Sequence, residues 1–302
     1  MSLPVQPDKE ATQGVFFGLC AYLMWGSFPL FFALFEGIPA WEILIHRVLW
    51  SCVFLVGLVS LLRRWTPIRA ALAEPRRLGR VLACAVLIGL NWGIYIYAVE
   101  SRQVFQASLG YFLTPLINVA LGVGFLKERM SPLQGVAVAL AAVAIGIQLA
   151  LLGSLPWITL VLATSFGTYG LLRKQVPLDG LSGLFVETLL LFPLGLLAIA
   201  WLSASGQSHF MQGDGQTTLL LIASGVITAL PLMAFAGAAR RLRLATLGFL
   251  MYLNPTIQFF IALLIFREPL SPIQLATFVL IWISLAIYSY SAWQQHPRER
   301  IA

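Results

Sequence analysis

Two ionisable side chains stand inside long apolar runs of this 302-residue chain, Arg47 in "ILIHRVL" and Glu187 in "GLFVETL". A charge at the centre of a bilayer costs about 2.5–3.5 kcal/mol on insertion scales, so a charged residue within a membrane span is a functional candidate that needs a partner. Glu100 and Arg240 end neighbouring apolar runs, and we expect the charge pairs Arg47–Glu100 and Glu187–Arg240. The pairs serve either to neutralise charge between helices or to gate a path through the membrane.

His46 precedes Arg47 and is a candidate for proton coupling, because histidine titrates near neutral pH; the alternative is a polar packing residue. The other histidines, His209 and His296, have no neighbouring cysteine or carboxylate cluster, so we expect no metal site and no cofactor. Catalysis needs clustered carboxylates, histidines or a nucleophile–base pair, and the sequence indicates no catalytic residues. It also lacks a Gly-x-x-x-x-Gly-Lys phosphate loop, which argues against ATP as the energy source.

Uncharged polar residues within the apolar runs form a second set of candidates. Asn118 and Gln258 each stand three residues after a proline, Pro115 or Pro255. A proline in a helix leaves a backbone carbonyl free, which a membrane tolerates only beside protein or a polar cavity. The amides therefore line a cavity or, alternatively, join helices. The expected substrate-binding residues are Trp25, Asn91, Trp92, Tyr95, Tyr111, Thr114, Asn118, Tyr252, Asn254 and Gln258.

Composition indicates which elements carry these residues. Of all residues 59% are apolar and only 10% are charged, whereas a soluble protein has about 25% charged residues. An apolar run of about 20 residues spans the membrane as a helix. Ten runs have this length: 14–35, 42–62, 79–99, 107–126, 132–151, 154–172, 181–203, 216–238, 245–266 and 272–292. The predicted fold is an all-α membrane protein with ten transmembrane helices.

The distribution of the basic residues predicts the orientation. Lysine and arginine in short loops mark the cytoplasmic side of a membrane. If the N-terminus is cytoplasmic, sixteen of the nineteen lysines and arginines fall in cytoplasmic segments, six of them between residues 63 and 80. Only Arg102 and Arg267 fall outside, and Arg47 lies within a span. We therefore expect both ends in the cytoplasm, a retained first span rather than a signal peptide, and no nucleic-acid partner for the net charge of +7.

A repeated phrase, "KERMSPLQ" at 127–134 and "REPLSPIQ" at 267–274, indicates a duplication. The same offset aligns Pro115 with Pro255 and Arg47 with Glu187. We predict five-helix repeats at 13–152 and 153–293, with cytoplasmic tails at 1–12 and 294–302. Five is odd, so the second repeat is inverted, which is the design of transporters with a site near the midplane. Channels, scaffolds and enzyme subunits are also built by duplication. We interpret the two phrases as the starts of helices and expect no catalytic or binding role for them.

Several stretches bear a family resemblance: "WEILIHRVLWS", "SLGYFLTPLINVALG", "FLKER" and "RLRLATLGFLMYLNP". Together with the repeat, they resemble the RarD proteins, bacterial members of the EamA group in the drug/metabolite transporter superfamily. The resemblance implies a permease of the inner (plasma) membrane and leaves its cargo open.

We therefore expect a secondary transporter of a small organic solute, a metabolite or a drug, that works by alternating access. The alternative is a membrane-embedded sensor or enzyme subunit without transport activity. The expected partners are a small-molecule substrate and the lipid bilayer. Homodimerisation, the direction of transport and the coupling ion stay open.

Overall fold

The computed structural model describes residues 7–35, 37–101, 103–151, 157–212, 215–265, 267 and 272–295. Over these residues the chain forms thirteen α-helices and no strand. The helices are α1 (Pro7–Gly26), α2 (Phe28–Phe32), α3 (Ala40–Leu61), α4 (Trp65–Ala73), α5 (Pro75–Glu100), α6 (Val104–Gly124), α7 (Pro132–Leu151), α8 (Trp157–Gln175), α9 (Gly180–Ala204), α10 (Gly215–Arg241), α11 (Leu244–Met251), α12 (Leu253–Leu264) and α13 (Pro272–Gln295).

Many of these helices have the length and apolarity that a membrane crossing requires. Six segments of at least 18 residues qualify: Lys9–Phe32, Ala40–Leu61, Pro75–Ala98, Gly180–Ala204, Gly215–Arg241 and Leu244–Ile261. Three shorter helical segments are also apolar: Leu109–Gly124, Pro132–Ile147 and Leu275–Ser291. The predicted class, an all-helical multi-pass membrane protein, is confirmed.

Two of the predicted spans are each divided into two helices. The run 14–35 breaks at Ser27, after which α2 begins with Pro29 in its first turn. Proline lacks a backbone N–H and its ring clashes with the preceding turn, which favours a break at this position. The run 245–266 breaks at Tyr252, between α11 and α12. The arginine-rich segment 63–80, expected to be a loop, contains α4 and the first residues of α5.

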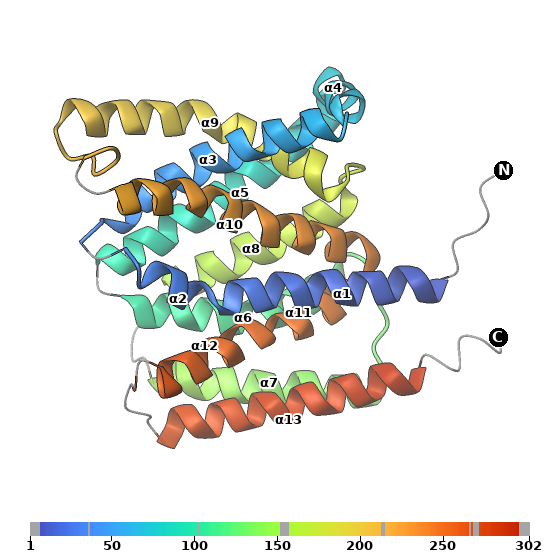
Figure 1. Cartoon of the computed structure of the whole chain (residues 1–302). Helices are drawn as coiled ribbons and strands as arrows, with labels where there is room; N and C mark the ends of the chain where they lie inside the picture. The colour runs from blue at the N-terminus through green and yellow to red at the C-terminus, as the bar shows by residue number, and fades with distance from the viewer. Residues whose placement is uncertain are drawn as a thin grey trace.

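The long helices run along a common direction, with α4 across it, and the beginning of α1 and the end of α13 lie at the same end of the bundle (Figure 1). Helices from the first half of the chain pack mainly against helices from the second half. α1 contacts α10 and α12, α3 contacts α9 and α10, α6 contacts α8 and α11, and α7 lies along α13. The two predicted repeats are therefore interleaved and do not form separate bodies.

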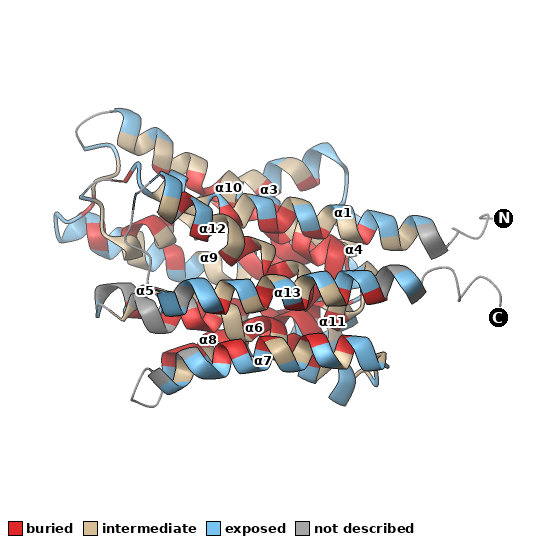
Figure 2. Cartoon of the chain, turned by 90° about the horizontal axis from the view of Figure 1, so that it is seen from below, coloured by how far each residue is buried: buried red, intermediate tan, exposed pale blue. Residues whose placement is uncertain are grey.

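Burial separates the interior of the bundle from its outer faces. Buried residues gather between the helices, and the visible outer faces of α7 and α13 are largely exposed or half-buried (Figure 2). Phe166 and Phe235 belong to the largest buried cluster, with ring centroids 5.2 Å apart. Large apolar side chains are nevertheless exposed, for example Leu194 and Leu197 on α9. Exposed apolar surface of this kind suits contact with lipid.

Candidate functional site

A cavity of about 420 Å³ lies within the bundle. This volume is in the range of small-molecule binding sites. Nine helices, α1, α2, α3, α5, α6, α8, α10, α11 and α12, contribute to its wall, so both halves of the chain form it. The wall is mainly apolar and aromatic. Its polar side chains that carry hydrogen-bonding or charged groups include Arg47, Asn91, Tyr95, Tyr111, Asn254 and Gln258.

Arg47 reaches the cavity from α3 and lies among aromatic rings. The distances from its Cζ atom to the ring centroids are 5.8 Å for Phe28, 5.3 Å for Phe32 and 5.7 Å for Trp92. A guanidinium within about 6 Å of an aromatic face is attracted by the ring quadrupole. Three rings, two from α2 and one from α5, thus surround one positive charge.

Arg47 makes one hydrogen bond to a side chain, from Nε to Oγ1 of Thr228 on α10, at 2.8 Å. Within the described part of the chain, no carboxylate lies within ion-pair distance of its guanidinium. The side chain of its predicted partner, Glu100, lies outside the described residues, so the pair Arg47–Glu100 stays a prediction. Among the described residues, Arg47 thus has the neutral hydroxyl of Thr228 as its hydrogen-bond partner and aromatic rings as its neighbours at the cavity.

Two amides on α12 form another polar part of the cavity wall. Gln258 donates through Nε2 to Oδ1 of Asn254 at 2.8 Å and to the backbone oxygen of Trp25 at 3.5 Å. Both amides were expected to lie near a solute site. Because one amide orients the other, the Asn254 amide nitrogen and the Gln258 carbonyl remain available for further hydrogen bonds.

Asn91 lies at the wall between α5 and α8. Its Nδ2 donates to the backbone oxygen of Leu162 and to Oγ of Ser165, both at 2.9 Å. These bonds link two helices, which is the joining role that the sequence left as an alternative for amides. The structure therefore brings seven of the ten predicted binding residues to one cavity: Trp25, Asn91, Trp92, Tyr95, Tyr111, Asn254 and Gln258. Their binding role stays a prediction.

Thr114 and Tyr252 are buried away from this cavity. Thr114 donates to the backbone oxygen of Gly110 at 2.7 Å, within its own helix. Tyr252 is 0% exposed at the junction of α11 and α12, and its hydroxyl has no partner among the described residues. Neither side chain contributes to the wall in this conformation.

Asn118 does not face the cavity together with Gln258, and the expectation that it would is wrong for this structure. Asn118 is 0% exposed, and within the described chain neither amide atom has a hydrogen-bond partner. Glycines let α8 and α11 approach it closely: a Cβ atom on Gly248 would lie 2.9 Å from the Asn118 Cβ, and one on Gly167 would lie 3.3 Å from its Oδ1. This close approach encloses the amide completely.

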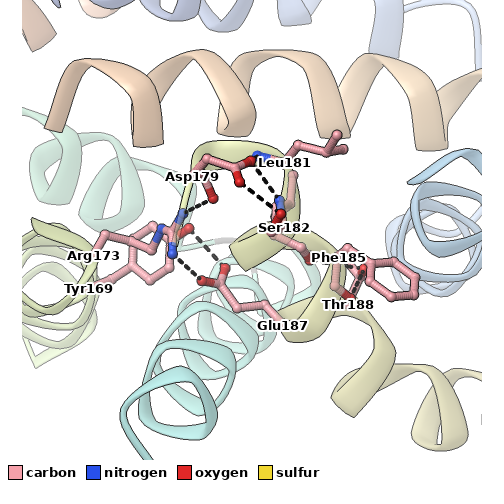
Figure 3. Close-up of polar contacts among 9 residues, drawn as sticks. Tyr169, Arg173, Asp179, Leu181, Ser182, Phe185, Glu187 and Thr188 are labelled. Atoms are coloured by element: carbon pink, nitrogen blue, oxygen red, sulfur yellow. Dashed lines mark hydrogen bonds and ion pairs between the residues drawn. The ribbon is translucent and has the colours of Figure 1, made fainter. Parts of the chain in front are cut away.

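Glu187 belongs to a second polar cluster, buried between α8 and α9 (Figure 3). Its Oε1 atom lies 3.6 Å from Nη1 of Arg173, and its Oε2 accepts a hydrogen bond of 3.0 Å from the Tyr169 hydroxyl. The side chains of Glu187 and Arg173 are 1% and 0% exposed. Arg173 also donates through Nη2 to the backbone oxygen of Asp179 at 3.2 Å.

The predicted pair Glu187–Arg240 is therefore wrong, because Glu187 pairs with Arg173 and Arg240 is exposed at the end of α10. α8 continues to Gln175, three residues beyond the predicted end of its span, which places Arg173 on a buried helix face instead of in a loop. The short connection to α9 then brings its guanidinium against the first turns of that helix.

Asp179 caps the first turn of α9 beside this cluster. Its Oδ1 accepts from the backbone N–H groups of Leu181 and Ser182 at 3.1 and 3.0 Å, and its Oδ2 accepts from the Ser182 hydroxyl at 2.8 Å. Burial acts to raise the pKa of Asp179, but the hydrogen bonds from Ser182, the charge of Arg64 and the bond from Leu181 together lower that pKa below its usual value. The carboxylate therefore stays ionised and holds the start of α9.

Glu128, in "FLKER", has a structural role that the sequence pattern did not indicate. Its Oε1 accepts from the backbone N–H of Leu244 at 2.7 Å, and its Oε2 accepts from that of Ala245 at 3.1 Å. These are the first N–H groups of α11, where a carboxylate is favoured by the free donors and by the helix dipole. The repeated acidic residue was the signal, but it was interpreted only as part of a helix boundary.

Glu42 is a second residue that was missed. It is 0% exposed and accepts from the backbone N–H of His209 at 2.6 Å, and its Oε2 lies 2.7 Å from the His209 Nδ1. These contacts attach the segment between α9 and α10 to the first turn of α3. An acid at the start of an apolar run and a lone histidine in a loop were both visible in the sequence, but nothing in it indicated that they meet.

His46 lies outside the cavity wall. Its Nδ1 accepts from the Trp50 indole at 3.2 Å, and its ring centroid is 4.8 Å from that of Phe210. Its role in proton coupling stays a prediction. Over the described residues, no three histidine, cysteine, aspartate or glutamate side chains gather in a way that could hold a metal ion.

The sequence of this chain matches a known family model and several known proteins. The model of the EamA-like transporter family matches residues 12–150. An uncharacterized transporter of Vibrio cholerae is 44% identical over 94% of this chain and 94% of its own length. Protein RarD of Escherichia coli is 42% identical over 94% of this chain and 96% of its own. The chain belongs to the RarD group of the EamA-like transporter family.

Other relatives agree with membership of the RarD group. The chloramphenicol-sensitive protein RarD of Pseudomonas aeruginosa is 34% identical over 93% of this chain and 94% of its own length. A solved crystal structure shares the fold, with a TM-score of 0.69 at 15% identity over 93% of this chain and 98% of that chain. The RarD resemblance seen in the sequence is confirmed. Membership of the EamA family indicates a multi-pass membrane transporter rather than an enzyme.

Proposed function

We propose that this RarD protein is a secondary transporter that moves a small organic solute across the bacterial inner membrane by alternating access. The cavity is the solute site. The observation that carries the proposal is the composition of its wall, to which nine helices from both halves of the chain contribute. Aromatic side chains give it apolar surface, and a few convergent polar groups can orient a solute, as is typical of small-molecule sites.

The proposed topology has ten membrane-spanning helices with both termini in the cytoplasm. In this topology α1 and α2 together form one span, and α11 and α12 together form another. α4 lies at the cytoplasmic surface, and each of the other eight helices is one span. The bias of the basic residues supports this orientation, and the position of the α1 start and the α13 end at one end of the bundle supports both termini on the same side of the membrane. In this topology the end of α1 at Gly26 and the start of α3 at Ala40 lie on the outer side. Because residues next to these ends line the cavity, the cavity also lies toward the outer side.

Inverted repeats are supported by contacts at matching positions of the two halves. Arg47 contacts the rings of Phe28 and Phe32, while Glu187, 140 residues later, contacts residues 169 and 173, each one residue beyond the position that the same offset gives. In the first half these contacts border the cavity. In the second half they form a dry cluster toward the inner side. We interpret the structure as the outward-facing state, with the cavity on the outer side and the inner side closed. In the inward-facing state, the two repeats would exchange these arrangements.

A metabolite-depletion screen tests the function. Cells that overproduce the protein are compared with cells that produce Gln258→Ala or Tyr95→Ala, and small organic solutes are quantified inside and outside. We expect at least one solute to change its distribution with the unmodified protein. Each variant should weaken the effect by roughly 2- to 10-fold, which corresponds to the loss of one orienting hydrogen bond.

Tyr97→Ala is the matched control, because Tyr97 lies on the same helix as Tyr95 but is exposed and outside the cavity wall. It should leave the solute effect unchanged. A screen in which no solute responds to the unmodified protein would contradict transport and favour a sensor or an enzyme subunit. Equal effects of Tyr95→Ala and Tyr97→Ala would contradict the position of the site.

A further inference from the structure

Arg47 is the one charged side chain that the described residues contribute to the cavity wall. Buried charges in proteins are normally paired, because removal of an ion from water costs several kcal/mol in practice. The hydrogen-bond partner of Arg47 is the neutral hydroxyl of Thr228, whose own proton is donated to the backbone oxygen of Ser224 at 2.7 Å. The cavity therefore presents a positive charge that no described carboxylate compensates.

The aromatic neighbours of Arg47 offset this charge only in part. A cation–π contact contributes about 0.5–1 kcal/mol at exposed sites and about 2 kcal/mol when desolvated. The rings of Phe28, Phe32 and Trp92 hold the guanidinium in place but accept no conventional hydrogen bond from its N–H groups. With Nε directed at Thr228, the two terminal nitrogens remain as donors. This fork matches the geometry of a carboxylate, which arginine binds with two parallel hydrogen bonds.

We propose that the transported solute is a monoanionic, amphipathic organic acid, with its carboxylate on Arg47 and its apolar body among the aromatic residues of the cavity. This inference rests on the proposed function. A single guanidinium balances a single negative charge, so a dianion would carry uncompensated charge into a mainly apolar cavity. Trp25, Tyr95 and Tyr111 supply flat apolar surface for the body of the solute.

The amides of Asn254 and Gln258 give the site a second polar region, on α12. They can bind an uncharged polar substituent of the acid, whereas Arg47 on α3 binds its anionic end. Arg47 and the α12 amides belong to different halves of the chain. One solute that contacts both ends therefore links the two halves through its own bonds.

Calorimetric titration of the purified full-length protein tests the inference with matched ligands. The probes are phenylacetate and hydrocinnamate, their uncharged amides phenylacetamide and hydrocinnamamide, and the dianion benzyl phosphate. We expect each acid to bind at least about tenfold more tightly than its amide, which is the size of a charge-assisted hydrogen bond. Benzyl phosphate at a pH where it is doubly charged should bind more weakly than either acid.

Variants assign the preference to one residue. Arg47→Gln should abolish the difference between acid and amide, and Arg47→Lys should retain part of it, because lysine keeps the charge without the fork. Arg69→Gln is the matched control, since Arg69 is exposed on α4. It should leave the preference unchanged. The comparison of acid with amide on the unmodified protein does not depend on whether Arg47→Gln folds.

The inference would be overturned by amides that bind as tightly as acids, by the absence of saturable binding of either acid at millimolar concentration, or by a preference that survives Arg47→Gln. A preference for acids that appears only in the Glu100→Gln variant would also overturn it. In that case the Glu100 carboxylate, and not the solute, would pair with Arg47 in the unmodified protein. Each of these results leaves the solute-depletion screen unaffected. Failure of transport itself would appear there, as the absence of any responding solute.

Discussion

Arg173 and Glu187 illustrate how strongly a single residue in the interior depends on its partner. Both side chains are withdrawn from solvent, and Arg173 Nε and Nη1 and Glu187 Oε1 have no hydrogen bond within the described structure. Removal of one member of a buried ion pair leaves the other charge uncompensated, which costs about 3–5 kcal/mol, whereas replacement of both members is often neutral. The pair is thus sensitive to single changes and tolerant of a matched double change.

Glu187→Gln and Arg173→Gln should each lower the free energy of unfolding by about 3 kcal/mol, and the double variant should lose less than the sum of the two. Thermal or denaturant unfolding in detergent measures these differences. Glu187→Gln combined with Arg240→Gln is the matched comparison and should show additive effects. Additivity in the Arg173 cycle, or coupling in the Arg240 cycle, would contradict the pairing seen in the structure.

At this scale the sequence identified many residues of the cavity but not their partners. Large aromatic and amide side chains within apolar runs predicted seven wall residues, because such side chains in a membrane span need a polar or protein environment. The position of Asn118 and the partner of Glu187 could not be predicted. α9, which carries Glu187, has almost no amphipathic pattern, so the sequence does not indicate which of its faces meets which neighbour.

Whole helices are positioned by small residues where they meet. α11 lies close to α6 because Gly248 has no side chain: an added Cβ would lie 2.9 Å from the Pro115 backbone oxygen and 2.9 Å from the Asn118 Cβ. Contacts under 3 Å between such atoms require a shift of one helix. The close contact between α6 and α11 therefore depends on one glycine.

Gly248→Ala should separate α11 from α6 and make Asn118 accessible to water. The measurement is the labelling rate of a cysteine introduced as Asn118→Cys, with a membrane-impermeant thiol reagent applied to inside-out vesicles. We expect labelling to rise several-fold in the Gly248→Ala background. Gly124→Ala is the matched control, because a Cβ atom on Gly124 meets no atom within 4 Å. Unchanged labelling with Gly248→Ala would show that α6 and α11 adapt without separating.

Two of the predicted spans contain a break between helices that the sequence did not predict. The lengths of the apolar runs predicted where helices lie, but they did not predict that two runs would be divided. Pro115 lies inside the continuous helix α6, whereas Pro255, at the matching position of the repeat, follows the break between α11 and α12. A proline removes one hydrogen bond in either case, and the surrounding packing decides whether the helix breaks.

For the molecule as a whole, the two halves of the chain are interleaved rather than adjacent. The sequence predicted the all-helical membrane class through its low content of charged residues and the lengths of its apolar runs. It also predicted the family through motifs that recur in both halves. The pairing of helices across the halves was not predictable, since apolar helices in a membrane associate through shape and small residues instead of charge patterns.

The orientation of the whole molecule gives a direct prediction. In intact cells, a cysteine in place of Ala70 on α4 should be protected from an impermeant thiol reagent, and a cysteine in place of Gln212 should react. Both positions are exposed on the protein surface, so burial within the protein does not confound the result. In inside-out vesicles the pattern should reverse. Reaction of position 70 in intact cells would overturn the orientation inferred from the basic residues.

The enclosed amide of Asn118 has a consequence for the balance between conformations. A buried amide without hydrogen bonds costs about 1–3 kcal/mol, which corresponds to a population ratio of roughly 5 to 150. We expect the contacts of α8 and α11 that enclose Asn118 to separate when the inner side opens in the proposed alternating-access cycle, so that water or solute then satisfies the amide. In that cycle, the unsatisfied amide would raise the free energy of the state with the closed inner side and bring it close enough to its alternative for the binding of one solute to shift the population.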